Sequence, residues 1–329
     1  MQMLDAMLSV SMVATVATLL WFYKTLAIRC GIIDRPNERS LHVTPTVRGG
    51  GVVFILTWLV ASGIVLMFFP IEHAIEILAA IVLVASVSFI DDVKSLSAKQ
   101  RFLIQIFASG LMIHAFWPMD WLSAILMMYG ALWAINHFNF MDGMDGFAAA
   151  QSIFVLLAYA ILFQSLDMQA DYWLTLLLSS AVGGFLLWNF PPARIFMGDV
   201  GSATLGFVIF IFACRASHVG HVSLASWVML NGLFLFDATV TLVRRILAGE
   251  KWYQAHKTHA YQRLYQAGFT VRQILFGQLV TNLAIGAMSW MSYCHPDSAT
   301  LMVVLEILLL TTLYLAMERY TISRQEQNA

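Results

Sequence analysis

Asn136-His-Phe-Asn-Phe-Met-Asp-Gly-Met-Asp-Gly146 is a polar stretch between two segments that are otherwise almost wholly apolar, at about 120–137 and 147–166. A charged group at the centre of a bilayer costs roughly 2.5–3.5 kcal/mol or more, and such groups are kept mainly for function. Residues three apart share a helix face. If the stretch is helical at its start, its amides and carboxylates form one polar stripe: Asn136, Asn139, Asp142 and Asp145. The stripe resembles a site for a divalent cation and a phosphorylated ligand.

The composition fixes the broad class of the protein. The chain has 329 residues, of which 60% are hydrophobic and 11% charged, and its mean hydropathy is +0.76. Soluble domains carry roughly 25% charged residues, so we expect an all-α membrane protein with several spans. The net charge of −1 gives no indication of nucleic-acid binding. Three distant cysteines predict neither a disulfide framework nor a zinc site: Cys30, Cys214 and Cys294.

Apolar windows of about 20 residues suit helices that cross a bilayer. We identify eleven of them, at about 4–23, 50–69, 73–90, 102–118, 120–137, 147–166, 172–190, 200–216, 222–243, 271–293 and 298–317. The first has Asp5 near its start and lacks a small-residue cleavage pattern, so we expect a mature helix rather than a signal peptide. The expected fold is a bundle of about 11 transmembrane helices, forming a single integral-membrane domain over residues 1–329.

The basic residues predict the orientation, because Lys and Arg accumulate on cytoplasmic loops. With the N-terminus outside and the C-terminus in the cytoplasm, all but one of the 18 Lys and Arg residues lie inside, and the exception is Arg215. The opposite orientation would reverse this distribution. The expected cytoplasmic loops are 24–48, 91–101, 138–146, 191–199 and 244–272.

Five polar clusters lie at the inner ends of the predicted helices. They are Asp34–Gly51, Phe89–Lys94, Asn136–Gly146, Phe196–Ser202 and His256–His259. Each has a purely structural interpretation: Asp199 would suit a helix N-cap, and Arg48-Gly-Gly-Gly51 either a turn or an anion-binding backbone nest. Independent structural features would scatter over both faces. Five clusters on one face therefore favour a shared functional site.

The chemistry of these clusters narrows the function. The carboxylates suit a hard, oxygen-preferring cation such as Mg²⁺ or Mn²⁺: Asp91, Asp92, Asp142, Asp145 and Asp199. The basic side chains are natural partners for phosphate: Arg48, Lys94, Arg101, His256 and His259. Acids, bases and a hard cation at a membrane surface predict phosphoryl transfer between a soluble donor and a lipid acceptor.

Three motifs together resemble the polyprenyl-phosphate N-acetylhexosamine-1-phosphate transferases. They are Phe89-Ile-Asp91-Asp92, Asn136-x-x-Asn139-x-Met-Asp142-Gly-x-Asp145-Gly146 and Met197-Gly-Asp199-Val-Gly-Ser202, and the resemblance extends from Asp34 to about Tyr261. It implies a bundle of ten or eleven helices in the bacterial inner membrane with a cytoplasmic active site. The implied reaction takes a UDP-sugar and undecaprenyl phosphate to undecaprenyl-diphospho-sugar and UMP, and initiates the synthesis of O-antigen or another cell-envelope polysaccharide.

The same resemblance implies a role for each matching residue. Asp199 is the expected ligand of Mg²⁺, with Mn²⁺ as the alternative ion. The expected catalytic residues are Asp91, proposed to assist the lipid phosphate, its neighbour Asp92, and the acidic pair Asp142 and Asp145. The expected substrate-binding residues are Asn136, Asn139, Lys94, Arg101, Arg48, His256 and His259.

The departures from the family favour one branch. The phospho-MurNAc-pentapeptide translocases of peptidoglycan synthesis have three consecutive histidines, whereas this chain has His256-Lys-Thr-His259. The Asp34–Gly51 segment looks more like the branch that initiates O-antigen. We therefore expect an N-acetylhexosamine or a 6-deoxy-N-acetylhexosamine as donor sugar, and keep the translocase as the alternative.

A membrane transporter coupled to a cation is the alternative from another class. Asp237 and Glu306 lie within predicted helices and could form a cation path with the Asn136–Gly146 stripe. Transporter sites are expected near the middle of the membrane, whereas nearly all acids here lie at one face. We expect Glu306 to form a bundle or homodimer contact. For Asp237, a role in the site and a pairing with a basic residue both remain open.

Overall fold

The computed structural model describes residues 2–36, 44–250 and 257–328, with side chains as far as residue 324. Contacts within the chain divide it into two compact units. The first unit contains residues 2–35 and 44–221, and the second contains residues 222–250 and 257–328. The single membrane domain expected from the sequence stays a prediction.

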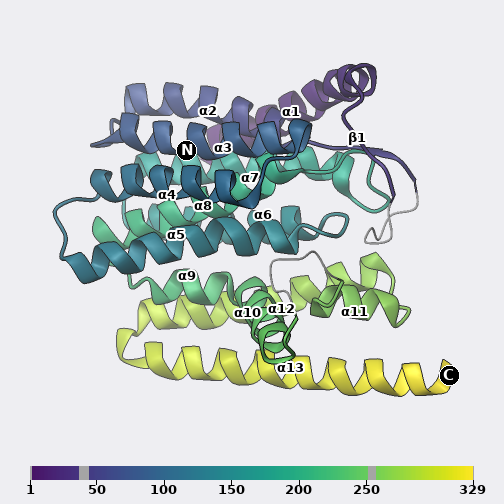
Figure 1. The fold of residues 1–329 in the computed structure, drawn as a ribbon. Helices are drawn as coiled ribbons and strands as arrows, with labels where there is room; N and C mark the ends of the chain where they lie inside the picture. The colour runs from purple at the N-terminus through teal and green to yellow at the C-terminus, as the bar shows by residue number, and fades with distance from the viewer. Residues whose placement is uncertain (1, 37–43, 251–256, 329) are drawn as a thin grey trace. The chain divides into compact units, whose positions relative to one another are not determined.

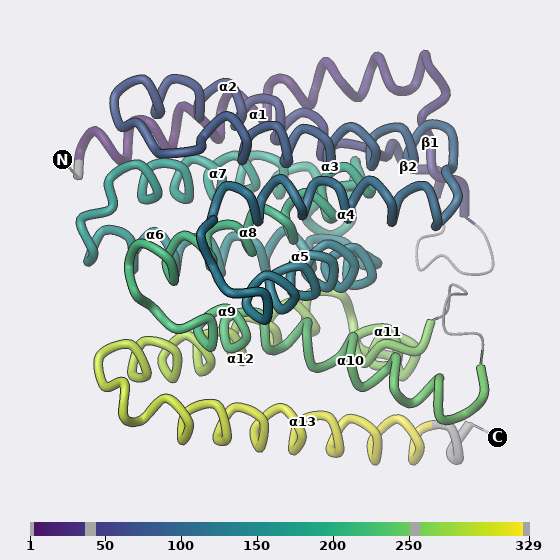
Figure 2. The backbone as a smooth tube through the Cα atoms, turned by 60° about the vertical axis from the view of Figure 1, so that its left-hand side comes forward, coloured from purple at the N-terminus to yellow at the C-terminus, as the bar shows by residue number. Residues whose placement is uncertain are grey.

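The first unit contains eight long helices, which lie side by side in Figures 1 and 2. They are α1 (Gln2–Cys30), α2 (Gly51–Phe68), α3 (Ala74–Lys94), α4 (Ala98–Ala115), α5 (Trp121–Met141), α6 (Phe147–Ser165), α7 (Gln169–Asn189) and α8 (Asp199–His218). Between α1 and α2, strand β1 (Ile33–Asp34) pairs antiparallel with β2 (Thr46–Val47), with Ile33 opposite Val47. Val47 also bridges Ile195, which tethers this hairpin to the segment before α8.

Helix α8 forms the centre of the first unit. Its residues from Val200 to Cys214 are all buried, and it contacts α2, α3, α5, α6 and α7. A helix that is apolar all round is a buried helix. Two glycines permit this close packing: a Cβ on Gly206 would lie 2.2 Å from the Ala134 carbonyl oxygen of α5, and a Cβ on Gly51 would lie 2.4 Å from the Cα of Gly201. The start of α8 is therefore held directly against the start of α2.

The second unit contains α9 (Ala225–Leu230), α10 (Gly232–Leu247), α11 (Ala260–Gln266), α12 (Val271–Cys294), the short 3₁₀ helix η1 (Pro296–Ser298) and α13 (Ala299–Asn328). The sequence predicts one continuous helix over 222–243, but the helix is interrupted at Asn231. Glu306 of α13 is buried against this interruption, because a Cβ on Gly232 would lie 1.8 Å from a Glu306 carboxylate oxygen. Glu306 thus makes a packing contact within the second unit.

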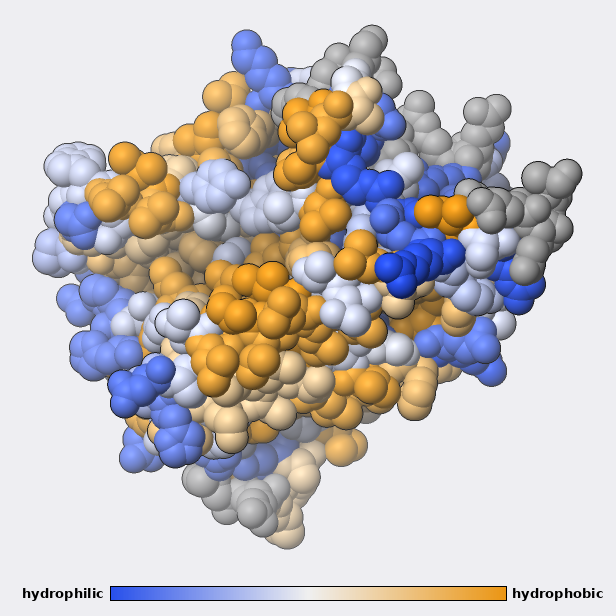
Figure 3. All heavy atoms as spheres, turned by 90° about the horizontal axis from the view of Figure 1, so that it is seen from below, coloured by the Kyte–Doolittle hydropathy of each residue, from blue (hydrophilic) through white to orange (hydrophobic). Residues whose placement is uncertain are grey.

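Within the described residues, eight helices are long and apolar enough to cross a membrane: α1, α2, α3, α6, α7, α8, α12 and α13. Large apolar side chains are exposed on their surfaces, among them Met67 and Ile75. Figure 3 shows apolar side chains gathered over the middle of one face, with hydrophilic ones toward its edges. The chain is therefore an all-α integral membrane protein. The count of eleven spans and the orientation of the termini stay predictions.

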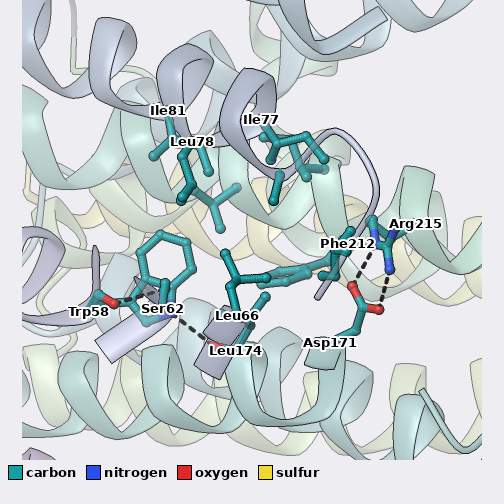
Figure 4. A pocket seen from close by; sticks show the side chains of 14 residues that line it. Trp58, Ser62, Leu66, Ile77, Leu78, Ile81, Asp171, Leu174, Phe212 and Arg215 are labelled. Carbon is teal, nitrogen blue, oxygen red and sulfur yellow. Dashed lines mark hydrogen bonds and ion pairs between the residues drawn. The ribbon is translucent and has the colours of Figure 1, made fainter. Parts of the chain in front are cut away.

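The one basic residue that the predicted orientation places outside is neutralised by a buried ion pair. Arg215 donates from Nε and Nη2 to the two carboxylate oxygens of Asp171, at 2.7 and 2.6 Å. Figure 4 shows the pair at the edge of a small apolar pocket lined by residues such as Trp58, Leu66 and Phe212. Asp171 lies in the first turn of α7 and Arg215 in the last turn of α8, so the pair lies at the opposite end of α8 from Asp199.

Candidate functional site

Asp92, at the end of α3, caps the beginning of α8. Its Oδ1 accepts the Asp199 N–H and its Oδ2 accepts the Val200 N–H, both at 3.0 Å. The first N–H groups of a helix have no partner within the helix and carry partial positive charge, so a buried carboxylate there is well placed. Only 4% of Asp92 is exposed. Both oxygens of this predicted catalytic residue are therefore used to join α3 to α8.

The Arg48-Gly-Gly-Gly51 run joins the same place through its backbone. The Gly50 and Gly51 N–H groups donate to the Phe196 and Met197 carbonyls at 2.9 and 2.8 Å. Their N–H groups are thus already bonded, which favours the interpretation as a turn over that as an anion-binding nest. The Arg48 guanidinium donates to the Asp92 carbonyl oxygen. Arg48 consequently lies beside the acids, as the sequence predicts.

Arg101 connects Asp91 and Asp199, the two partly exposed acids beside Asp92. Its Nη1 donates to Asp91 Oδ2 at 2.7 Å and to Asp199 Oδ2 at 3.0 Å. The Asp91 side chain is 12% exposed and the Asp199 side chain 33% exposed, so a ligand in solvent can reach both. Asp91 comes from α3, Arg101 from α4 and Asp199 from α8. The three residues that the sequence predicts to act together are therefore in direct contact.

The acidic pair after α5 is divided between two tasks. Asp142 follows the last residue of α5 and is half-buried. Burial, followed by the charges of Asp199, Asp92 and Asp145, raises the pKa of the Asp142 carboxyl well above its usual range. Asp142 thus belongs electrostatically to the same acidic group. Asp145 instead accepts the Ala193 N–H at 2.8 Å, which fastens the loop between α7 and α8.

The predicted amides lie on the inner end of α5 and contact different partners. Asn139 donates to the Ser202 hydroxyl of α8 at 3.2 Å, whereas Asn136 donates to the Gln105 side chain of α4 at 3.1 Å. Asn139 therefore lies at the start of α8 with the acids. Lys94 ends α3, two residues after Asp92, and its side chain is exposed.

Sequence reasoning missed two amides that organise this region. Asn189 accepts the Gly146 N–H at 2.8 Å and donates to the Ile195 carbonyl at 3.0 Å, so it links the α5–α6 loop to the α7–α8 loop. Gln105 is buried and accepts from Asn136. Neither residue lies in an acidic or glycine-rich motif. The one available signal for Asn189 is its position at the end of an apolar segment, just before Phe190-Pro-Pro.

In the second unit, Asp237 organises the start of α11, where the predicted His259 lies. Its carboxylate accepts the Ala260 N–H at 3.0 and 2.9 Å, accepts the Thr241 hydroxyl at 3.0 Å, and lies 3.3 Å from His259 Nδ1. His259 is 4% exposed and stacks on Tyr261. Asp237 therefore pairs with His259, and pairing with a basic residue is one of the two roles that the sequence leaves open. His256 lies outside the described residues.

The acids fit a cation that arrives together with phosphate. In the part of the chain that the structure describes, no three His, Cys, Asp or Glu side chains form a group that could hold a metal ion by themselves. Mg²⁺ usually keeps several waters and is held by one or two carboxylates plus substrate phosphates, rather than by an all-protein cage. Asp91 and Asp199 converge on one cationic group, the Arg101 guanidinium. Two such carboxylates provide the share of ligands that Mg²⁺ takes from a protein.

Comparison with known proteins identifies the family of this chain. Residues 74–217, which run from α3 into α8, match the family described as glycosyl transferase family 4. The chain is also 31% identical to the probable undecaprenyl-phosphate N-acetylglucosaminyl 1-phosphate transferase of Bacillus subtilis (strain 168), over 76% of this chain and 74% of the relative. The chain belongs to glycosyl transferase family 4. The resemblance expected from its motifs is thereby confirmed.

Other relatives of this family 4 chain carry related names. It is 27% identical to the decaprenyl-phosphate N-acetylglucosaminephosphotransferase of Mycolicibacterium smegmatis, over 92% of this chain and 86% of the relative. It is 26% identical to the undecaprenyl-phosphate alpha-N-acetylglucosaminyl 1-phosphate transferase of Escherichia coli (strain K12), over 87% of this chain and 84% of the relative. The similarity therefore extends over most of each protein.

Proposed function

We propose that this family 4 chain transfers N-acetylglucosamine 1-phosphate, or the 1-phosphate of a closely related N-acetylhexosamine, from a UDP-sugar to undecaprenyl phosphate. The products are undecaprenyl-diphospho-sugar and UMP, and the reaction initiates O-antigen or another cell-envelope polysaccharide. The observation that carries the proposal is the contact of Asp91, Arg101 and Asp199 at the ends of α3, α4 and α8. The names of the relatives favour N-acetylglucosamine over a 6-deoxy sugar and over the peptidoglycan translocase reaction.

The location of the acids supports a reaction at the membrane boundary. Asp91 and Asp92 end one apolar helix and Asp199 begins another, so the site lies where a lipid phosphate and a soluble nucleotide sugar can meet. The distribution of Lys and Arg supports the cytoplasmic side of the inner membrane for this face. We extend the proposal to eleven spans, with the N-terminus outside and the C-terminus in the cytoplasm. A homodimer remains part of this proposal.

The reaction forms one phosphorus–oxygen bond and breaks another. An oxygen of the lipid phosphate attacks the β-phosphorus of the UDP-sugar, and the bond from that phosphorus to the bridging oxygen breaks, so that UMP leaves with the electron pair. A phosphate monoester has a second pKa near ~6 and is largely dianionic at pH 7. The acceptor is therefore already nucleophilic. Asp91 has the role of positioning rather than of removing a proton.

Asp199 and Asp91 are the residues that would hold Mg²⁺, with Mn²⁺ as the alternative, and the ion supplies neutralisation of the negative charge on the diphosphate. Arg48, Lys94 and Arg101 are the basic side chains near these acids that can bind phosphate oxygens. Asn139 and Asp142 adjoin the same acids and form the wall for the nucleotide sugar. His256 is proposed to bind phosphate as well, whereas the buried His259 is proposed to hold the start of α11 through Asp237.

The purified protein, incubated with undecaprenyl phosphate and a panel of UDP-N-acetylhexosamines, tests this function. We expect UMP and a diphospholipid in equal amounts, with UDP-N-acetylglucosamine as the best donor. Asp199→Asn should abolish both products. Asp120→Asn is a matched control, because Asp120 caps the far end of α5 and Asn caps helices equally well. No product with any donor would contradict the function, and sugar uptake by vesicles that contain the protein, without a lipid product, would favour the transporter.

A further inference from the structure

One guanidinium nitrogen occupies the position between the two carboxylates that face solvent. Arg101 Nη1 is 2.7 Å from Asp91 Oδ2 and 3.0 Å from Asp199 Oδ2. Asp91 Oδ1 accepts the Leu96 N–H, and both oxygens of Asp92 cap α8. The Oδ2 atoms of Asp91 and Asp199 are thus the acidic atoms that converge on one point, and Arg101 holds a positive charge there.

The backbone of Arg101 is fixed by the start of α4, whereas its long side chain is partly exposed. Helix α4 begins with a capping box, in which Ser97 Oγ accepts the Gln100 N–H and the Gln100 side chain accepts the Ser97 N–H. Capping boxes anchor the first turn of a helix, and Arg101 follows it directly. The Arg101 side chain itself is 35% exposed. A long, partly exposed side chain can change rotamer without any change in α4.

A divalent ion that binds both oxygens competes with this guanidinium for the space between them. Mg²⁺ requires oxygen ligands at about 2.0–2.1 Å, and Arg101 Nη1 already lies at 2.7 and 3.0 Å from the same oxygens. An ion placed between them would lie against a like charge in a part-buried site. Arg101 must therefore leave at least one carboxylate when the ion enters, and its donors are then available to another anion.

We propose that Arg101 is a resident cation that the divalent ion replaces when the diphosphate donor binds. Before the donor binds, Arg101 neutralises Asp91 and Asp199. With the donor present, the ion takes these carboxylates and the Arg101 guanidinium turns to the phosphate oxygens, for which its planar fork is suited. The site accordingly takes its ion as a complex with a nucleoside diphosphate and holds the free ion weakly. This inference rests on the proposed function.

Mn²⁺ binding to the purified full-length protein, followed by electron paramagnetic resonance, tests the exchange. Without the donor, wild type should bind Mn²⁺ weakly. With UDP-N-acetylglucosamine present, it should bind Mn²⁺ at least about tenfold more tightly, in the range typical of coupled sites. Arg101→Gln should bind Mn²⁺ alone about tenfold more tightly than wild type, because the competitor is gone, and the gain from the donor should shrink. Lys99→Gln is the matched control: it removes an exposed charge from the same helix and should leave Mn²⁺ binding unchanged.

Two results overturn the exchange. The first is that Arg101→Gln has the melting temperature of wild type yet binds Mn²⁺ no more tightly than Lys99→Gln does. The second is that the Mn²⁺ affinity of wild type is the same with and without the donor. This result overturns the exchange even if Arg101→Gln does not fold. UMP release by wild type is measured in the same preparations. Turnover without any change of Mn²⁺ affinity overturns the exchange alone, whereas absence of turnover overturns the proposed function with it.

Discussion

The Asp92 carboxylate accepts the backbone N–H of Asp199 at 3.0 Å, so one acid of the site holds the backbone of another. Asp91, its neighbour in sequence, faces the Asp199 side chain through Arg101. Two adjacent aspartates at the end of α3 therefore have different tasks. Asp92 fixes where α8 begins, and Asp91 faces the place where charge must be neutralised.

Replacement of each acid should separate these tasks. Asp92→Asn keeps one acceptor oxygen but loses a charged cap, and we expect it to destabilise the protein by about 1–3 kcal/mol and to lower activity together with the melting temperature. Asp91→Asn should lower kcat while the melting temperature stays close to that of wild type. Thermal unfolding and UMP release, measured on the same preparations, check both. An Asp92→Asn protein with wild-type stability and no activity would contradict the capping role.

Asp142 should make stability depend on pH. Burial and the charges of Asp199, Asp92 and Asp145 raise the pKa of its carboxyl well above the usual range. A group whose pKa is raised in the folded state contributes stability below its unfolded pKa and loses it as pH rises through the folded pKa. Asp142→Asn removes this loss. The difference between the melting temperature of the variant and that of wild type should therefore shift in favour of the variant as pH rises from about 4 to 9. A difference that is constant over this range would contradict the shift.

Asp237 should hold the start of α11 in place. Its carboxylate accepts the Ala260 N–H and contacts His259, and hydrogen bonds to charged groups contribute about 1.5–3 kcal/mol. We expect Asp237→Ala to speed amide hydrogen exchange in the peptide that contains Ala260, and Asp237→Asn to do so less. Thr241→Ala removes one neutral donor to the same carboxylate and serves as the milder control. Unchanged exchange in Asp237→Ala would show that the cap does not hold this segment.

The buried pair of Asp171 and Arg215 should act as a unit in stability. Removal of one partner leaves an uncompensated buried charge and costs about 3–5 kcal/mol, whereas replacement of both by apolar residues is often neutral. Arg215→Met should therefore unfold at much lower temperature than wild type, and Arg215→Met with Asp171→Leu should recover most of the loss. A double variant no more stable than Arg215→Met would contradict this account.

The apolar pattern of the sequence predicts most of the helices, because helices in lipid must consist of long apolar runs. The interruption at Asn231 escapes prediction, since residues 222–243 are apolar on both sides of it and the buried contact of Glu306 with Gly232 comes from 74 residues further along the chain.

The candidate site is predicted in part. Its acids are visible as charges at the ends of apolar segments, and three of the predicted residues meet directly in the contact of Arg101 with Asp91 and Asp199. Sequence cannot distinguish Asp91 from Asp92, because their different tasks depend on where α8 begins. Asn189 is missed for the same reason: it carries no charge, and its partners belong to two other loops.

The dependence of turnover on a divalent cation tests the central claim most directly. Wild-type protein is incubated with undecaprenyl phosphate and UDP-N-acetylglucosamine, treated with EDTA, and then supplied with Mg²⁺. We predict that EDTA abolishes the release of UMP, that Mg²⁺ restores it, and that Asp199→Asn remains at least roughly 100-fold slower at any Mg²⁺ concentration. Undiminished UMP release in EDTA, or full activity of Asp199→Asn, would contradict the account.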